Sequence, residues 1–243
     1  MKEKIRLDRL VQEKYPQYSR QQIQSWIMQG KVSVDGTVVT KSGTLYPVVS
    51  DIILDTQEPK YVSRAGFKLE AALEHWQIDV TDFICMDAGI STGGFTDCLL
   101  QHGARRIYGI DVGWGQVHPK VVQNDRVILL ERTNLRYVQE LPELVDLVTL
   151  DLSFISVLKV MPVVVHILKP QGKLIVLVKP QFEAQRHQVG RGGIITNEAV
   201  HQEVIEKVIQ GITAYGFMHH GVIPSPITGS SGNKEFLAYF TRQ

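Results

Sequence analysis

Residues 84–96 read ICMDAGISTGGFT, and this stretch decides the fold. An apolar run ends at Asp87, a glycine-rich turn follows, and a helical pattern begins near Gly94. Glycines let the backbone approach a ligand closely, and the first turn of a helix presents free N–H groups. Because ligands of open parallel sheets bind at this end of the strands, the stretch predicts a ligand site. A plain glycine-rich turn is the alternative.

Strand and helix patterns alternate after residue 62, which predicts an α/β fold with a doubly wound, mostly parallel sheet. The expected strands cover residues 83–87, 106–111, 127–130, 147–151 and 173–178. The expected helices lie near residues 94–101, 157–168 and 198–215. Residues 218–222 and 235–240 are typical of a terminal antiparallel hairpin.

The chain is expected to have two domains. Residues 1–55 predict a small α+β domain, residues 56–62 a linker, and residues 63–243 the large α/β domain. Ser19 is a plausible N-cap for a helix in the small domain, and helical spacing from Ile5 onward indicates another helix before it.

Residues 31–39 of the small domain predict two short strands around an Asp-Gly turn at residues 35–36, which is the strongest short signal for a hairpin. Residues 51–54 predict a closing strand.

The composition excludes several classes of protein. Of 243 residues, 44% are hydrophobic, and the formal net charge is +1, so an RNA partner would need a local basic patch. Cys85 and Cys98 provide no disulfide framework. Since neither a signal peptide nor a membrane-length apolar run is seen, we expect a cytoplasmic protein without a membrane partner. The eight histidines lack metal-ligand spacing, so no metal is expected, and the oligomeric state stays open.

The glycine-rich turn lacks the dinucleotide pattern Gly-x-Gly-x-x-Gly. The next strand ends at Asp111, 24 positions after Asp87 (111 − 87 = 24), where a carboxylate can accept both ribose hydroxyls of an adenosine. Asp111 suits NAD as well, but the Asp87 loop favours S-adenosylmethionine, whose sulfonium needs no pyrophosphate cradle. The candidate cofactor-binding residues are Asp87, Gly89, Ser91, Thr92, Gly93, Gly94, Phe95, Asp111 and Val112.

Four charged residues are candidates for the chemistry. Asp151 and Lys179 end two expected strands, Glu235 starts the last strand, and Lys68 lies in the helix after the linker. A lone charge at a strand end is often only a surface cap, whereas two on adjacent strands beside a nucleotide loop indicate a site. A lysine held by a carboxylate in a partly dry site can polarise a hydroxyl, because burial lowers its pKa.

The small domain resembles the S-four domain, an RNA-binding module, through Arg6-Leu7-Asp8, Ser19-Arg20, residues 30–36, Lys41 and Asp51. The resemblance implies that basic residues on the two helices contact RNA phosphates. Residues 1–60 hold nine Lys/Arg and seven Asp/Glu, an excess of only 9 − 7 = +2, so solvated surface charges are the alternative.

The set Lys68, Asp151, Lys179 and Glu235 resembles the Lys-Asp-Lys-Glu tetrad of FtsJ-like ribose 2′-O-methyltransferases. The strings YVSRAGFKL, STGGFTDCLL, DLSFIS and KPQFE around it resemble the TlyA family over nearly the full chain. That family joins an S-four domain to a Rossmann-like methyltransferase domain and methylates cytidine 2′-hydroxyls in ribosomal RNA. Some of its members are called haemolysins.

The resemblance implies roles for the four residues. Lys179 would polarise or deprotonate the 2′-hydroxyl, Asp151 would orient Lys179, and Lys68 with Glu235 would complete the charge network. The implied partner is ribosomal RNA or a ribosomal subunit. The candidate RNA-binding residues are Arg6, Arg9, Arg20, Lys31, Lys41, Arg64, Arg186 and Arg191.

Three other functions remain open at this stage. A pseudouridine synthase with an S-four domain would need a mainly β catalytic domain, which the alternating pattern disfavours. A non-catalytic RNA-binding or regulatory protein on a methyltransferase fold is the second alternative. A haemolysin-like protein is the third, and the lack of an apolar span argues against it.

Overall fold

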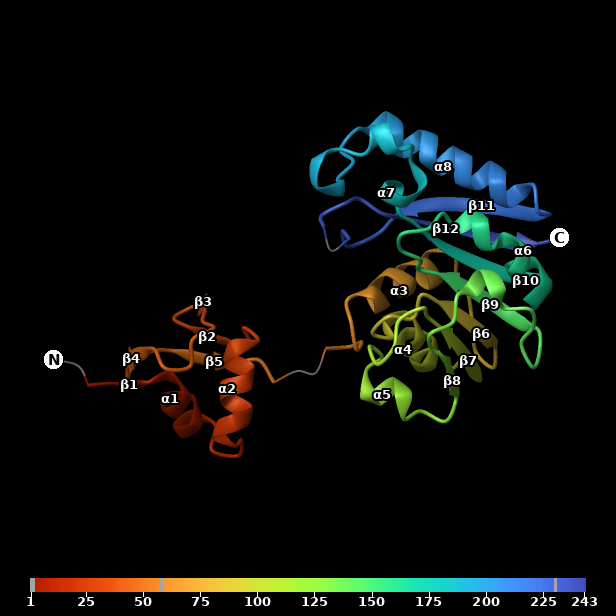
Figure 1. The fold of residues 1–243 in the computed structure, drawn as a ribbon. Helices are drawn as coiled ribbons and strands as arrows, with labels where there is room; N and C mark the ends of the chain where they lie inside the picture. The colour runs from red at the N-terminus through yellow and green to blue at the C-terminus, as the bar shows by residue number, and fades with distance from the viewer. Residues whose placement is uncertain (1–2, 57–58, 230) are drawn as a thin grey trace. The chain divides into compact units, whose positions relative to one another are not determined.

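The structure is a computed structural model that describes residues 3–56, 59–229 and 231–243. The chain divides into two compact units, Met1–Pro59 and Lys60–Gln243, each with its own hydrophobic core. Figure 1 shows both, and each unit is described by itself.

The first unit packs two helices against short strands (Figure 1). Its helices are α1 (Leu7–Lys14) and α2 (Arg20–Met28). Strand β1 (Lys4–Arg6) pairs with β4 (Leu45–Pro47), and the second sheet has the order β3 (Thr37–Val38), β2 (Val32–Val34), β5 (Ile52–Leu54).

Local sequence signals account for most of this unit. Ser19 caps α2 in a capping box with Gln22, as predicted. Asp35 and Gly36 both have positive φ (50° and 79°), as a two-residue hairpin turn requires. The expectation of a helix from Ile5 was wrong at its start, because Ile5 pairs with Tyr46 in the β1–β4 sheet.

A buried carboxylate joins the two helices of the first unit. Asp8 is fully buried and accepts hydrogen bonds from the side chains of Arg6 (3.0 Å), Arg20 (2.9 Å) and Gln24 (2.7 Å). The hydrogen bond from Arg6 is the largest cause that holds the pKa of Asp8 far below its ordinary value, although burial opposes it. The ionised carboxylate therefore fixes α1 to the N-terminal end of α2.

The second unit is built on a seven-stranded sheet. Its spatial order is β11 (Phe217–Pro224), β12 (Phe236–Arg242), β10 (Leu168–Val178), β9 (Val145–Leu150), β6 (Ile84–Ala88), β7 (Arg106–Ile110), β8 (Val127–Leu130). The five strands from β10 to β8 are parallel, whereas β12 runs antiparallel to both of its neighbours. The doubly wound, mostly parallel sheet and the terminal antiparallel hairpin are confirmed.

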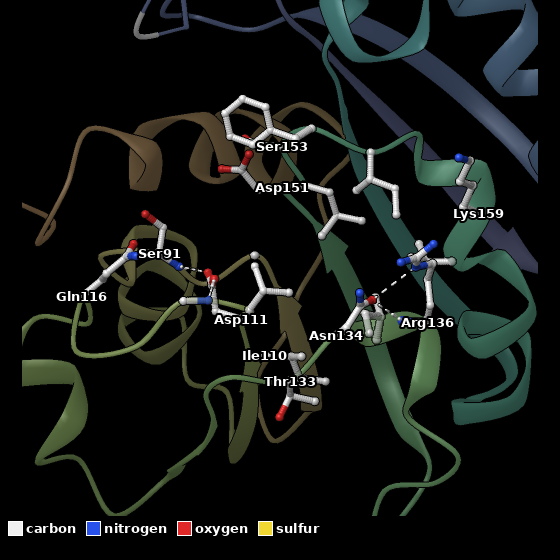
Figure 2. Close-up of a pocket in the computed structure, with 18 residues that line it drawn as sticks. Ser91, Ile110, Asp111, Gln116, Thr133, Asn134, Arg136, Asp151, Ser153 and Lys159 are labelled. Carbon is white, nitrogen blue, oxygen red and sulfur yellow. Dashed lines mark hydrogen bonds between the residues drawn. The ribbon is translucent and has the colours of Figure 1, made fainter.

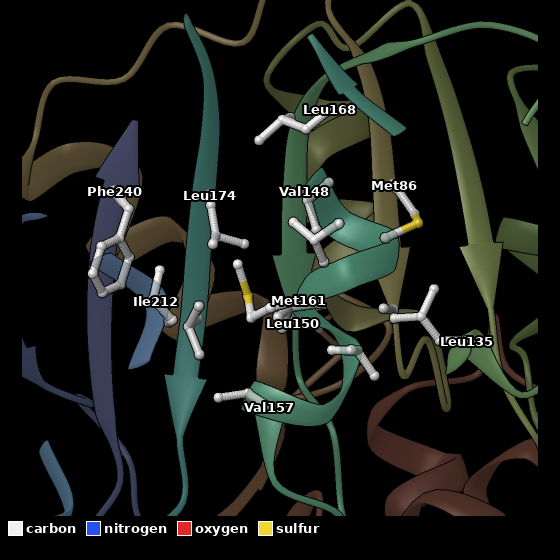
Figure 3. Close-up of a cluster of buried hydrophobic side chains, with 14 of the residues drawn as sticks. Met86, Leu135, Val148, Leu150, Val157, Met161, Leu168, Leu174, Ile212 and Phe240 are labelled. Carbon is white, nitrogen blue, oxygen red and sulfur yellow. The ribbon is translucent and has the colours of Figure 1, made fainter. Parts of the chain in front are cut away.

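Helices cover both faces of this sheet. The helical elements are α3 (Ala65–His75), α4 (Gly94–Gln101), α5 (Pro119–Val122), η1 (Leu135–Tyr137), η2 (Val157–Val160), α6 (Met161–Ile167), α7 (Pro180–Glu183), η3 (Arg186–Gln188), η4 (Arg191–Gly193) and α8 (Glu198–Thr213). Figure 3 shows one face, where Met161 and Ile212 pack against Val148, Leu174 and Phe240. The other face packs against α3 and α4.

Two predictions about this unit need correction. The helix expected at 157–168 is two elements, η2 and α6, and β10 begins at Leu168, with a register irregularity before Lys173.

The expected linker also extends too far along the chain. Tyr61 is only 1% exposed within the second core, and the N–H of Val62 donates to Asp97 at 2.9 Å. Residues 57–58 of that linker lie outside the described residues.

We expect Asp8→Ala to destabilise the first unit by about 2 kcal/mol, because Arg6, Arg20 and Gln24 lose their shared acceptor. Hydrogen exchange of the full chain would then show roughly thirtyfold faster opening of amides in residues 3–56. Glu13→Ala removes an exposed carboxylate from the same helix and is the control. Equal exchange in the two variants would show that Asp8 does not hold the helices together.

Candidate functional site

A cleft of about 580 Å³ opens at the carboxyl ends of β6, β7, β8 and β9 (Figure 2). Its lining includes Gly89, Ser91, Asp111, Val112, Gln116, Thr133, Asn134, Leu135, Asp151, Ser153 and Phe154. The cleft therefore lies at the end of the sheet where the sequence predicts a ligand site. The segments that follow four of the parallel strands line this cleft.

The glycine-rich turn fits under this cleft because two of its positions carry no side chain. Gly89 has φ of 83°, and a Cβ there would lie 2.4 Å from the carbonyl oxygen of Asp151. Gly93 has φ of 99° and is the N-cap of α4, although it does not itself line the cleft. The two glycines bring the turn against the end of β9 and start the helix.

Asp111 is held firmly at the wall of the cleft. Its carboxylate accepts the N–H of Ser91 and the N–H of Gly113, both at 2.8 Å. Each oxygen keeps a further lone pair, so the group can still accept hydroxyls of a ligand. Val112 beside it is 69% exposed and presents apolar surface.

Asp87, one of the candidate cofactor-binding residues, does not line the cleft. It is fully buried and accepts the hydroxyls of Thr96 (2.7 Å) and Thr149 (3.0 Å). Burial raises the pKa of Asp87 to about 7, against these two hydrogen bonds. Asp87 thus joins β6 to α4 and β9 beneath the turn.

A smaller hollow of about 80 Å³ continues from the cleft. It shares Gly89, Ser91 and Asp151 with the cleft. Its other lining residues are Ser63, Ala65, Ile90, Thr92, Gly94 and Phe95. A Cβ at Gly94 would lie 2.2 Å from the Oγ of Ser63, so α3 and α4 approach closely there.

The four candidate catalytic residues form two ion pairs. Lys179 Nζ lies 2.6 Å from Asp151 Oδ1, and Lys68 Nζ lies 2.6 Å from Glu235 Oε2. The side chains are 3–16% exposed, so each charge is largely withdrawn from water but keeps a partner.

The register of the sheet brings the two ion pairs to one edge, namely the edge formed by the carboxyl ends of the parallel strands. Val178 is opposite Phe236, so Lys179 and Glu235 adjoin the ends of neighbouring strands. Asp151 follows β9, the strand on the other side of β10, and Lys68 reaches the edge from α3. The structure therefore gathers the four residues beside the cleft, which Asp151 lines.

Sequence reasoning missed several residues of this site. Ser153 Oγ accepts a hydrogen bond from Lys179 Nζ at 2.9 Å and also lines the cleft. Gln116 and residues 133–135 line it too. Their position in the sequence could have identified them, because they shortly follow β7 and β8, and the loops after parallel strands line the ligand site of such a sheet.

The candidate RNA-binding residues differ in their surroundings. Arg6 and Arg20 are paired with Asp8, whereas the side chains of Arg9 and Lys41 make no ion pair with a described residue. Lys31 is half-buried. Arg64, Arg186 and Arg191 of the second unit are exposed.

A second glycine-rich loop, from Gly190 to Ile195, is fastened by a buried asparagine. Asn233 is 1% exposed, donates to the carbonyl of Gly193 and accepts the N–H of Ile195, both at 2.9 Å. The loop from Gly190 to Ile195 is thereby attached two positions before Glu235.

The described residues contain neither a metal-binding cluster nor a membrane-spanning helix. Across residues 3–56, 59–229 and 231–243, no cluster of three or more His, Cys, Asp or Glu side chains has a metal-binding arrangement. In the same residues, no helix combines the length and apolar character needed to cross a membrane.

The fold and the cleft define a Rossmann-like methyltransferase. The FtsJ-like methyltransferase family model matches residues 61–242, and the S4 domain model matches residues 5–53. The chain belongs to the FtsJ-like methyltransferase family and carries an S4 domain.

Relatives of known name match nearly the whole chain. The chain is 39% identical to the 16S/23S rRNA (cytidine-2′-O)-methyltransferase TlyA of Mycobacterium tuberculosis, over 93% of this chain and 85% of that protein. It is 38% identical to Hemolysin A of Brachyspira hyodysenteriae, over 97% of this chain and 99% of that protein. A solved Streptococcus thermophilus structure that carries a hemolysin name is 38% identical, with a TM-score of 0.76 over 100% of this chain and 90% of that chain. The resemblance to the TlyA family is confirmed.

Asp87 should give the protein a measurable pH dependence. Its folded pKa is raised from 3.8 to about 7, so its stabilising contribution is complete below the unfolded value and is lost as pH rises through about 7. Asp87→Asn keeps the shape without the charge, so its melting temperature relative to the wild type should rise by several degrees from pH 5 to pH 8, at ~2–4 °C per kcal/mol for a unit of this size.

The control is Asp79→Asn, because hydrogen bonds from Thr81 lower the pKa of Asp79, so its charge is the same in the folded and unfolded states from pH 5 to pH 8 and the difference from the wild type should stay constant. A constant difference between Asp87→Asn and the wild type across this pH range would contradict the raised pKa.

Proposed function

We propose that this protein is an S-adenosylmethionine-dependent methyltransferase that modifies the ribose 2′-hydroxyl of cytidine in ribosomal RNA. The observation that carries the proposal is the pair of lysine–carboxylate contacts at one sheet edge, beside a cleft with a fixed carboxylate. Family membership and the printed activity of the TlyA relative support it.

The residues present fit S-adenosylmethionine. Asp111 has free lone pairs for the two ribose hydroxyls of the adenosine, and Val112 offers apolar surface to the adenine. The smaller hollow at Thr92, Gly94 and Phe95 suits the narrower amino-acid part. The cofactor supplies an electrophilic methyl group when bound.

Methyl transfer needs a ribose hydroxyl that is positioned and polarised. Lys179 would hold the hydroxyl oxygen or take its proton, and Asp151 with Ser153 would orient the ammonium group. Lys68 and Glu235 would hold the ribose and complete the charge network.

The S4 domain points to an RNA substrate, and the name of the TlyA relative narrows it to ribosomal RNA or ribosomal subunits. In the first unit Arg9 and Lys41 are exposed, so they are better placed than Arg6 and Arg20 to give their charge to phosphates. Lys31, Arg64, Arg186 and Arg191 would add contacts. A ribosomal substrate implies a cytoplasmic enzyme.

Two alternatives have less support. A non-catalytic RNA-binding protein would have no need for two partly buried ion pairs beside an open cleft, because such pairs are costly to bury. A haemolysin-like function rests on the names of relatives alone, and the described residues include no membrane-spanning helix.

Lys179→Ala should reduce ribosomal RNA methylation by roughly 10³-fold, since general acid–base or charge-stabilising contributions reach that size. Calorimetry should find cofactor binding retained, because Asp111 and the glycine-rich turn are untouched. Lys173→Ala, on the same strand away from the cleft, is the matched control. Loss of cofactor binding in Lys179→Ala, or full activity, would contradict the assigned role.

Replacing Arg9 and Lys41 together by glutamine should weaken RNA binding and flatten its salt dependence. Each lost phosphate contact lowers the slope of log K against log salt by about 0.7–0.9, so the expected change is roughly 1.4–1.8. Filter binding at several salt concentrations measures the slope, with Lys173→Gln as the control. An unchanged slope would rule out these two side chains as phosphate contacts.

A further inference from the structure

A second cleft of about 420 Å³ opens at the same sheet edge. It lies at the ends of β11 and β12 and is lined by Ser225, Thr228, Glu235, Phe236 and the first turns of α8. The first cleft lies at the ends of β6, β7, β8 and β9. Strand β10 separates β9 from β12 in the sheet, and Lys179 follows it. Lys179 therefore stands between the two clefts, and Glu235 lines the second one.

The charges around the second cleft are matched. Glu235 is paired with Lys68 at 2.6 Å, and Glu198 is paired with Lys234 at 3.3 Å. Within the described residues, the side chains of Gln202 and Thr228 make no hydrogen bond, so both remain free for a ligand. A lining without surplus charge and with free amide and hydroxyl groups suits a neutral polar ligand rather than a phosphate.

Flat rings form another part of the wall. His201 and Phe236 lie with their ring centroids 5.5 Å apart and their planes at 61°. His201 is 3% exposed and its Nε2 is 3.1 Å from the carbonyl oxygen of Ile195, so its position is fixed. The buried His201 ring supports Phe236, and half-buried Phe236 is the aromatic side chain of the lining that offers ring surface to another planar ring.

Hydrogen bonds within the chain hold the wall of the cleft in place. Asn233 fastens the 190–195 loop, and the carbonyl oxygen of Glu235 accepts the N–H of Ser225 at 2.9 Å. A Cβ at Gly229 would lie 2.5 Å from Glu235 Oε1, so glycine lets this loop close around the carboxylate. A preformed cavity of this size lies in the range that binds small organic ligands.

We propose that the second cleft binds an unpaired nucleobase of the acceptor RNA strand, and we call it the acceptor cleft. This inference rests on the proposed function. If the methyl donor fills the first cleft, the RNA must reach Lys179 from the other side, where the acceptor cleft opens. A nucleobase is planar, neutral and edged with donors and acceptors, as the lining requires, and single-stranded RNA is commonly bound by stacking such bases on aromatic side chains.

Filling the acceptor cleft tests the proposal. Gln202→Trp places a large side chain in the space, and kcat/KM for ribosomal RNA should fall at least tenfold while calorimetric cofactor affinity stays within twofold. Thr228→Val removes only a hydroxyl, and the expected loss is about fivefold, which corresponds to one hydrogen bond. Gln210→Trp, on the exposed surface of the same helix, is the control. Normal RNA methylation by Gln202→Trp would overturn the proposal.

The target nucleotide is first located by mapping the ribose methylated by the wild type, and an RNA fragment that spans it then gives an independent measurement. Single abasic nucleotides are introduced at and around the target, and methylation by the wild type and by Gln202→Trp is compared. One abasic position should slow the wild type and leave Gln202→Trp unaffected, since the lost base and the filled cleft remove the same contact. Independent effects at every position would refute a base in this cleft, whereas failure of the wild type to methylate any ribosomal RNA would overturn the proposed function itself.

Discussion

The two ion pairs at the sheet edge are the constraint on which the functional half of the molecule depends. Removing two ammonium groups and two carboxylates from most of their water is costly unless each charge meets its partner in good geometry. Sheet register supplies that geometry, because Lys179 and Glu235 adjoin the ends of neighbouring strands. A one-residue slip of β10 would turn Lys179 to the opposite face and leave Asp151 alone. The buried packing of β10 on both faces resists such a slip.

Local patterns in the sequence were sufficient to predict most of the fold. Ser19 caps its helix, the Asp35 turn forms its hairpin, and the alternating apolar runs form the parallel sheet, since each signal acts within a few residues. The β1–β4 pair was missed because Ile5 meets Tyr46, a partner about forty positions away. The burial of Tyr61 was missed for a similar reason: its neighbours lie on α3 and α4, so composition alone suggested a linker.

The site was less predictable than the fold because position at a strand end does not determine a side chain's surroundings. Asp87 and Asp111 both end apolar runs before loops, yet Asp87 lies within β6, where its carboxylate accepts hydrogen bonds from Thr96 and Thr149. Asp111 lies one residue beyond its strand and remains at the cleft wall. The sequence likewise does not distinguish Arg6 and Arg20 from Arg9. In the structure, Arg6 and Arg20 form ion pairs with Asp8. Only the neighbours in the folded structure show which charged side chains are paired within the protein and which remain available to a ligand.

Charge pairing also explains how lysines can stand beside the proposed donor site. A sulfonium is a cation, and a second positive charge about 4 Å away would cost roughly 4 kcal/mol at an effective dielectric constant near 20. Two unpaired lysines at this rim would therefore oppose cofactor binding. Asp151 and Glu235 cancel that repulsion while leaving the lysine N–H groups in place to meet an oxygen. The chemistry then needs no surplus positive charge at the reacting centre, and under the proposed function the attraction for RNA phosphates would fall to exposed residues such as Arg9 and Lys41.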